Sequence, residues 1–242
     1  MTTAPHADQV RLLDVQELDT RADQLAHQRR TLPELATVAA LESRRADLHT
    51  ALTTSRTTSD DLVRELAKAE ADVEQVRARA VRDQSRLDSG TASLKDVQAL
   101  TAEIEHLAGR QAALEDTQLA AMERLETQQS ALDAAQEAFD AVETELASAR
   151  AAASTAVAAL DAQATEVAQQ RTAAADGLDS GLLTLYEKLR AQRGGLGAGR
   201  LVGRRCEGCH MELNPLDLEA IGAAPPDQVV RCEECGRILV RA

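Results

Sequence analysis

A long proline-free stretch constrains the fold of this chain more than any other feature. From Glu34 to Arg193 the sequence contains no proline. Apolar residues recur there with the heptad spacing of a coiled coil, in two series that begin at Val38 and Val97. Eleven of fifteen seam positions are apolar in the first series, and seventeen of twenty-one in the second. Such a pattern predicts two long helices that pack along a thin apolar seam.

Two interruptions divide the helical pattern. Pro33 lacks an amide donor but suits the first turn of a helix, so we expect a kink near residues 31–34. The turn-forming residues around Gly90 predict a hairpin tip near residues 88–93. Residues 1–8 read as a short disordered start before the first amphipathic helix.

The short tip favours antiparallel pairing of the two arms within one chain. A parallel dimeric coiled coil is the alternative, and it stays open at this point. The sequence therefore predicts a mostly α fold, with a long antiparallel coiled-coil hairpin over residues 1–193. The expected oligomeric state is a monomer or a weak dimer.

The only four cysteines lie near the C-terminus, as Cys206-x2-Cys209 and Cys232-x2-Cys235. Each pair places two sulfurs on one tight turn, and two such turns can supply four thiolates to a tetrahedral ion. Four thiolates would leave no open coordination position. The pattern predicts one structural Zn²⁺ held in a small β zinc ribbon, with residues 194–242 forming a hinge and this C4 ribbon.

Other roles for the cysteines are weaker. Two disulfides would suit an exported protein, but the N-terminus shows no signal-peptide pattern. A redox C-x-x-C needs a βαβ context that the sequence lacks, and an iron–sulfur centre remains a minor alternative. His210 directly follows Cys209 and is not needed as a ligand when four thiolates are present.

The segments that flank the cysteines complete the expected ribbon. Leucines and Tyr186 are concentrated between residues 178 and 189, which we expect to dock the ribbon onto the base of the hairpin. The glycines of residues 194–199 predict a flexible hinge, and a phosphate loop there is disfavoured because no Gly-Lys-Ser/Thr follows. Residues 201–202, 228–231 and 237–240 predict short antiparallel strands, with a helical turn at Leu216–Ala220.

Composition and charge exclude several classes of protein. The 242 residues include one Phe, one Tyr and no Trp, which suits thin helical seams better than a thick globular core. No apolar run is long enough to span a membrane. The formal charge of −13 lies entirely before Arg193, so an acidic body would repel nucleic acid and anionic lipid. Reduced cysteines and the absent export signal predict a cytoplasmic protein.

With both motifs in view, the chain resembles a bacterial C4-type zinc-ribbon family in which a long helical hairpin precedes the ribbon. Relatives in that family are linked to flagellar or type III secretion control, to chaperoning an alternative sigma factor and to messenger RNA binding. The resemblance implies an adaptor or regulator. It is carried by four stretches: residues 98–105, residues 182–190, Cys206-Glu-Gly-Cys-His-Met and Cys232-Glu-Glu-Cys-Gly-Arg-Ile-Leu-Val.

These observations predict a non-enzymatic cytoplasmic adaptor that binds protein partners through the hairpin. No nucleophile–base set or paired carboxylates can be argued from the sequence, and no small-molecule substrate is expected. The alternative is nucleic-acid binding through a basic face of the ribbon, against which stand equal numbers of acids and no stacking aromatic residue there. That face would consist of Arg204, Arg205, Arg231, Arg237 and Arg241.

Overall fold

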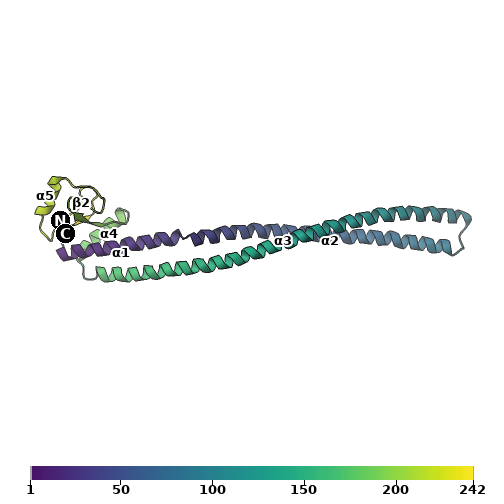
Figure 1. Cartoon of the computed structure of the whole chain (residues 1–242), viewed down its shortest axis with the longest axis horizontal. Helices are drawn as coiled ribbons and strands as arrows, with labels where there is room; N and C mark the ends of the chain where they lie inside the picture. Colours follow the sequence, from purple (N-terminus) through teal and green to yellow (C-terminus); the bar gives the residue numbers. More distant parts are fainter. Residues whose placement is uncertain (1, 242) are drawn as a thin grey trace. The chain divides into compact units, whose positions relative to one another are not determined.

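The computed structural model describes residues 2–241, and its helices follow the predicted order (Figure 1). The strand predicted at residues 228–231 is wrong, since only isolated bridges form there, at Gln228 and Arg231. The helices are α1 (His6–Arg30), α2 (Pro33–Asp88), α3 (Leu94–Ala175), α4 (Ser180–Gln192) and α5 (Pro215–Ala223). The strands are β1 (Ala198–Val202), β2 (Arg205–Cys206) and β3 (Ile238–Arg241). The predicted fold class, a long helical hairpin followed by a small sheet region, is confirmed.

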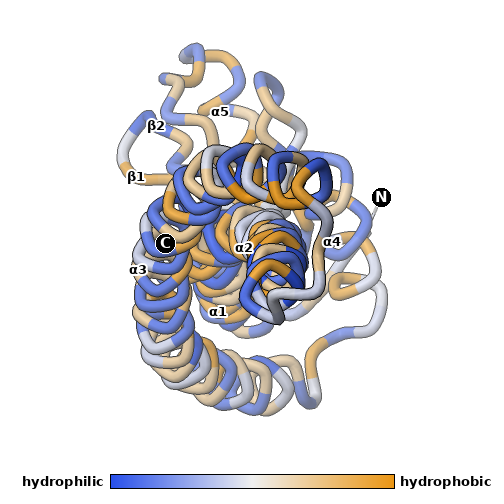
Figure 2. The backbone as a smooth tube through the Cα atoms, turned by 90° about the vertical axis from the view of Figure 1, so that its right-hand side faces the viewer, coloured by the Kyte–Doolittle hydropathy of each residue, from blue (hydrophilic) through white to orange (hydrophobic). Residues whose placement is uncertain are grey.

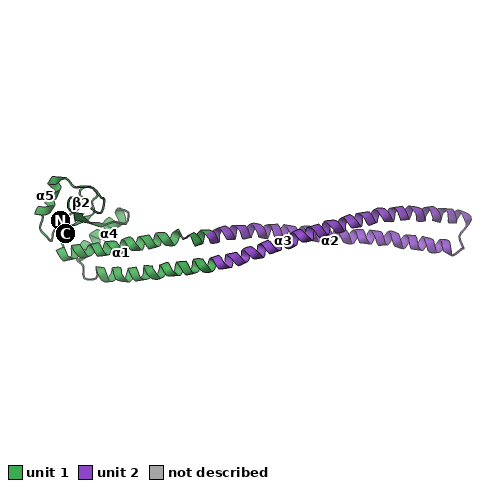
Figure 3. Ribbon diagram, viewed as in Figure 1, with its two compact units in different colours: residues 1–36, 150–242 green, residues 37–149 purple. Residues whose placement is uncertain are grey.

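Contacts divide the chain into two compact units, which Figure 3 colours separately. Unit 1 contains residues 1–36 and 150–242, and unit 2 contains residues 37–149. This division cuts across α2 and α3 and places the start of the chain in the same unit as the ribbon. The functional division at residues 193 and 194 stays a prediction.

Unit 2 is a pair of antiparallel helices with a narrow apolar seam. Its residues alternate between hydrophobic and hydrophilic along each helix (Figure 2). The buried side chains all fall on predicted heptad positions: Leu52, Ser59, Leu62, Ala69, Val73 and Val76 of α2, and Leu107, Ala121, Val142 and Leu146 of α3. Ion pairs between the two helices flank this seam, including Arg124–Glu65 at 2.7 Å and Arg79–Glu103 at 2.8 Å. Pairing inside one chain therefore accounts for the heptad pattern.

The tip is closed by a glycine and a helix cap. Gly90 adopts φ 67°, a left-handed conformation that side chains with a Cβ rarely adopt. Ser93 then caps α3, because its hydroxyl accepts from the amide of Asp96 while the Asp96 carboxylate accepts from Ser93. These hydrogen bonds from Ser93 lower the pKa of Asp96.

In unit 1, α1 and α4 pack against the sheet. One buried cluster joins all of these elements, and it consists of Ala4, Leu12, Val15, Leu182, Tyr186, Leu189, Ala198, Ile238 and Val240. The large apolar side chains of α4 thus dock the ribbon, as the sequence predicts. The three strands are ordered β2-β1-β3.

Strand direction differs from the sequence-based expectation. β1 pairs antiparallel with β2, but β1 and β3 run parallel, from Ala198 opposite Ile238 to Leu201 opposite Arg241. The expectation of antiparallel strands throughout is therefore wrong. β1 precedes the first cysteine turn in the sequence, whereas β3 follows the second. The chain therefore runs in the same direction in both strands.

The start of the chain is ordered, and the predicted disorder of residues 1–8 is wrong for every residue that the structure describes there; Met1 lies outside the described residues. Thr3 pairs with Gln228 as an antiparallel bridge. Ala4 is buried, and its amide donates to the carbonyl of Asp227 at 2.8 Å. The first residues thus add an edge to the segment that leads into Cys232.

The glycine-rich linker at residues 194–199, which the sequence predicts to be a flexible hinge, makes specific contacts with α1. Gln16 of α1 accepts hydrogen bonds from the amides of Gly197 and Ala198 at 2.7 and 3.2 Å. A Cβ on Gly197 would come within 2.7 Å of Tyr186. The glycine here permits close packing rather than motion.

Candidate metal centre

The two cysteine turns are built from the same backbone hydrogen bonds. In the first, the amide of His210 donates to the carbonyl of Cys206 at 2.7 Å, and the amide of Cys206 donates to Met211 at 3.0 Å. In the second, Gly236 donates to Cys232 at 2.7 Å and Cys232 donates to Arg237 at 2.9 Å. The similar sequences Arg-Cys-Glu-Gly-Cys-His and Arg-Cys-Glu-Glu-Cys-Gly therefore fold into one repeated turn.

An arginine braces each turn from outside. The Nε of Arg205 donates to the carbonyl of His210 at 2.9 Å, and the Nε of Arg231 donates to Gly236 at 2.7 Å. Each arginine precedes the first cysteine of its turn. These side chains satisfy carbonyls that the tight turn leaves without a strand partner.

The residue that follows each turn needs a left-handed backbone. Gly236 has φ 71°, which costs a glycine nothing. His210 occupies the equivalent place with φ 62° and is the one non-glycine residue with positive φ in the described part of the chain. This conformation costs a residue with a Cβ about 1–2 kcal/mol.

The turns bring four sulfurs together. The Sγ atoms of Cys206, Cys209, Cys232 and Cys235 all lie within 4.8 Å of one another. Cys209 and Cys232 Sγ are 3.9 Å apart, close to the roughly 3.8 Å that tetrahedral Zn–S bonds of about 2.3 Å require. All four are free thiols, and the sulfur separation is far from a disulfide bond of about 2.05 Å. The arrangement fits one zinc ion with four sulfur ligands.

The surroundings make the thiols unequal before metal binds. Burial raises the pKa of Cys232 to about 12 and also raises the pKa of Cys206. Burial acts in the same direction at Cys235, but hydrogen bonds with Arg237, Cys232 and Cys209 together outweigh it and lower the pKa of that thiol to about 7. Protons therefore compete with the metal mainly at the two buried cysteines.

Apolar side chains and a close glycine contact support the sulfur cluster. Buried residues packed with Cys206 and Cys232 form a second core, which contains Leu213, Ile221, Val230 and Leu239. A Cβ on Gly199 of β1 would come within 2.7 Å of the amide nitrogen of Gly208. β1 can thus lie directly against the first turn.

A buried polar network joins α3 and α4 to α1. The hydroxyl of Tyr186 donates to Asp19 Oδ2 at 2.7 Å, and Arg171 of α3 pairs with the same carboxylate at 3.2 Å. Burial, reinforced by the hydrogen bond to Asp19, raises the pKa of Tyr186. Sequence reasoning missed Asp19 and the buried glutamines Gln9 and Gln16. Gln9 and Gln16 lie three and four residues from Leu12, and Asp19 lies seven residues from it, which is a signal that all three share its helical face.

The five arginines singled out for nucleic acid serve mainly the ribbon's own backbone. Arg205 and Arg231 brace the cysteine turns, and Arg237 donates to Leu196 and Arg193 carbonyls at 2.9 and 3.0 Å. Arg241 donates to five carbonyls between residues 221 and 228. Arg204 alone of the five has no side-chain partner within residues 2–241.

Comparisons with known proteins agree with both parts of this fold. Residues 15–194 match the CT398-like coiled coil hairpin domain, and residues 205–239 match the C4-type zinc ribbon domain. Neither description is that of an enzyme. No described helix combines the length and apolar character that a bilayer-spanning segment needs.

Relatives extend over nearly the whole chain. Protein Rv2229c of Mycobacterium tuberculosis is 37% identical over 97% of this chain and 96% of its own length. A solved structure from Mycobacterium smegmatis has a TM-score of 0.88 at 35% identity, covering 99% of this chain and 100% of that one. CT398 from Chlamydia trachomatis shares the fold, with a TM-score of 0.74 at 18% identity and 98% coverage of each chain. The chain therefore belongs to the family of CT398-like coiled-coil hairpin proteins that carry a C4-type zinc ribbon.

Proposed function

We propose that this protein is a non-enzymatic adaptor, in which the hairpin binds protein partners and the zinc ribbon supplies a rigid second surface. The observation that carries the proposal is the closed sulfur cluster. Four cysteine ligands would fill a tetrahedral shell, so no position is left for a water or substrate. Zinc would then stabilise the folded ribbon rather than take part in a reaction, and the protein would function through its surface.

Cys206, Cys209, Cys232 and Cys235 are the proposed ligands. Bound zinc would tie the two cysteine turns together, which this small unit needs because its own core is thin. Because thiolates must stay reduced to hold the ion, the proposal places the protein in a reducing compartment such as the cytoplasm.

The hairpin supports a role in protein binding. Unit 2 buries only a narrow seam, so most side chains of α2 and α3 there are exposed. Nucleic-acid binding is less well supported. Four of the five candidate arginines already donate to ribbon carbonyls, which reduces the donors left for phosphate.

Affinity capture with the zinc-loaded full chain, with and without nuclease, tests this proposal. We expect specific protein partners that survive nuclease treatment. A matched chain with Arg204→Glu should capture the same partners. Retention of RNA or DNA alone, lost with nuclease or with Arg204→Glu, would contradict the adaptor role and favour the nucleic-acid alternative.

A further inference from the structure

Two polar contacts between α2 and α3 lie on one flank of unit 2. Arg56 donates to Gln136 at 2.6 Å, and Arg77 pairs with Glu115 at 3.2 Å. Arg56 and Arg77 are three heptads apart, and so are Glu115 and Gln136. Residues at whole heptads between these pairs lie on the same flank of the hairpin.

Between these two bridges the flank carries exposed apolar side chains. Val63 lies one heptad after Arg56, and Met122 lies one heptad after Glu115. They are 50% and 47% exposed. Leu119 is three residues before Met122, hence on the neighbouring stripe of α3, and is 56% exposed. We call Val63, Leu119 and Met122 the apolar strip.

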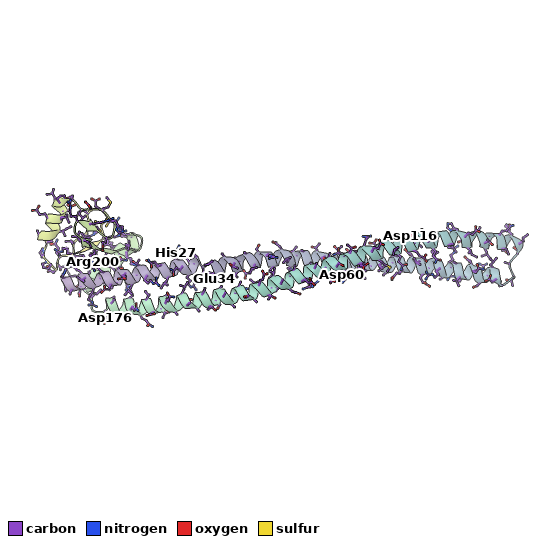
Figure 4. The ribbon with its side chains drawn as sticks, viewed as in Figure 1. His27, Glu34, Asp60, Asp116, Asp176 and Arg200 are labelled. Atoms are coloured by element: carbon purple, nitrogen blue, oxygen red, sulfur yellow. The ribbon has the colours of Figure 1, made fainter. Side chains whose placement is uncertain are left out.

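Acidic side chains outnumber basic ones around the apolar strip, by six to four over residues 56–77 of α2 and by a wider margin on α3. From residue 111 to residue 129, α3 carries Glu115, Asp116, Glu123 and Glu126 against a single base, Arg124. Arg124 is already paired with Glu65 of α2. Figure 4 shows Asp116 on α3 and Asp60 on α2, and both side chains are exposed. The strip therefore combines apolar contact area with a negative rim.

The negative charge extends over the whole of unit 2. Residues 37–149 carry 22 acidic and 12 basic side chains, a formal charge of −10. A second copy of this chain would bring two such surfaces together and be repelled. A basic partner would be attracted by this negative charge, and it could cover the apolar side chains at the same time.

Resting on the adaptor role, we propose that the apolar strip of unit 2 is the docking site for a basic amphipathic helix of a partner protein. Such a helix would lie along the flank between the Arg56–Gln136 and Arg77–Glu115 bridges and form a local three-helix bundle. The span of three heptads corresponds to about 30 Å of helix. Leucine-like residues at spacings of three and four would cover the strip, with lysine or arginine facing the acidic rim.

A synthetic peptide of about 21 residues, with leucines at spacings of three and four and lysine elsewhere, probes this site on the zinc-loaded full chain. Fluorescence anisotropy measures its affinity. Two further peptides serve as references, one with glutamate in place of lysine and one with the leucine stripe scrambled. We expect the lysine peptide to bind at least about tenfold more tightly than either reference, and its binding to weaken as salt rises.

Substitutions locate the binding. The double change Leu119→Gln and Met122→Gln should weaken the lysine peptide about tenfold without a change of charge. Its control is Val81→Gln, since Val81 is 60% exposed elsewhere on α2. Asp116→Lys with Glu123→Lys should weaken the peptide more than the matched acids Asp133→Lys with Glu137→Lys.

Three results would overturn the docking site: equal binding of lysine and scrambled peptides, equal loss in the strip and control variants, or self-association of the wild type that the glutamine double variant abolishes. These results differ from failure of the adaptor role. If affinity capture returns partners equally with wild type and the glutamine double variant, the adaptor stands and the strip is wrong. If the wild type captures none, the adaptor role itself fails.

Discussion

Gln16 is the side chain whose removal most directly tests how the ribbon is attached to the helices. It is 7% exposed, and its Oε1 accepts from the amides of Gly197 and Ala198 while its Nε2 donates to the carbonyl of Gly195 at 3.1 Å. Gln16→Ala removes both acceptor contacts. The two amides lie at the start of β1, where no other acceptor replaces the lost one.

The expected cost follows from these contacts. A buried donor left without a partner costs about 1–3 kcal/mol, so two amides give roughly 2–6 kcal/mol. Water entering the space left by the removed side chain reduces this cost, and we expect a loss of about 2–4 kcal/mol. Amide hydrogen exchange at Gly197 and Ala198 should accelerate by the corresponding factor of about 30–1,000.

Gln24→Ala is the matched control, because Gln24 is an exposed glutamine on the same helix. It should leave exchange at the two amides unchanged. Zinc release to a coloured chelator gives a second measurement, which should be faster for Gln16→Ala alone. Exchange at Gly197 and Ala198 that stays at the wild-type rate in Gln16→Ala would refute the reasoning.

The remaining predictions concern the cysteine turns and the seam. Removal of zinc by a chelator should unfold the ribbon, so that the amide of Leu239 loses its protection from hydrogen exchange. The helical circular dichroism signal of unit 2 should persist. His210→Gly should raise the stability of the zinc-loaded ribbon by about 0.5–1 kcal/mol in urea unfolding, because it removes a left-handed strain, and Gly236→Ala should lower it by about 1–2 kcal/mol. Gln128→Leu, which deletes the hydrogen bond from Gln128 to Ser55 inside the seam, should raise the urea midpoint of the hairpin by replacing a polar layer with apolar contact.

Much of the fold could be predicted because it depends on local periodicity. Heptad spacing placed Leu62 and Val142 in the seam, and the turn-forming residues around Gly90 placed it in the tip. The interval around Pro33 likewise separates α1 and α2 in the structure. These features require only the residues within a few turns, so one sequence carries them.

The attachment of the ribbon could not be predicted in the same way. Cys-x2-Cys spacing identifies the four sulfurs that meet, but nothing local to Gln16 indicates that it will accept hydrogen bonds from the amides of Gly197 and Ala198. Thr3 and Gln228 similarly carry no local signal that they pair. Contacts between residues so far apart in sequence depend on tertiary packing, and a single sequence leaves them open.

The contact between α1 and the segment around Pro226 bears on how the protein folds during synthesis. Gln9 donates to the carbonyl of Pro226, 217 residues later, so α1 cannot complete its contacts until the segment around Pro226 has left the ribosome. Closing an unstructured loop of that length would cost about 5 kcal/mol in entropy. Early zippering of the helical arms shortens that loop in advance. During synthesis the segment around Gln9 must therefore stay without this contact until the segment around Pro226 has been made.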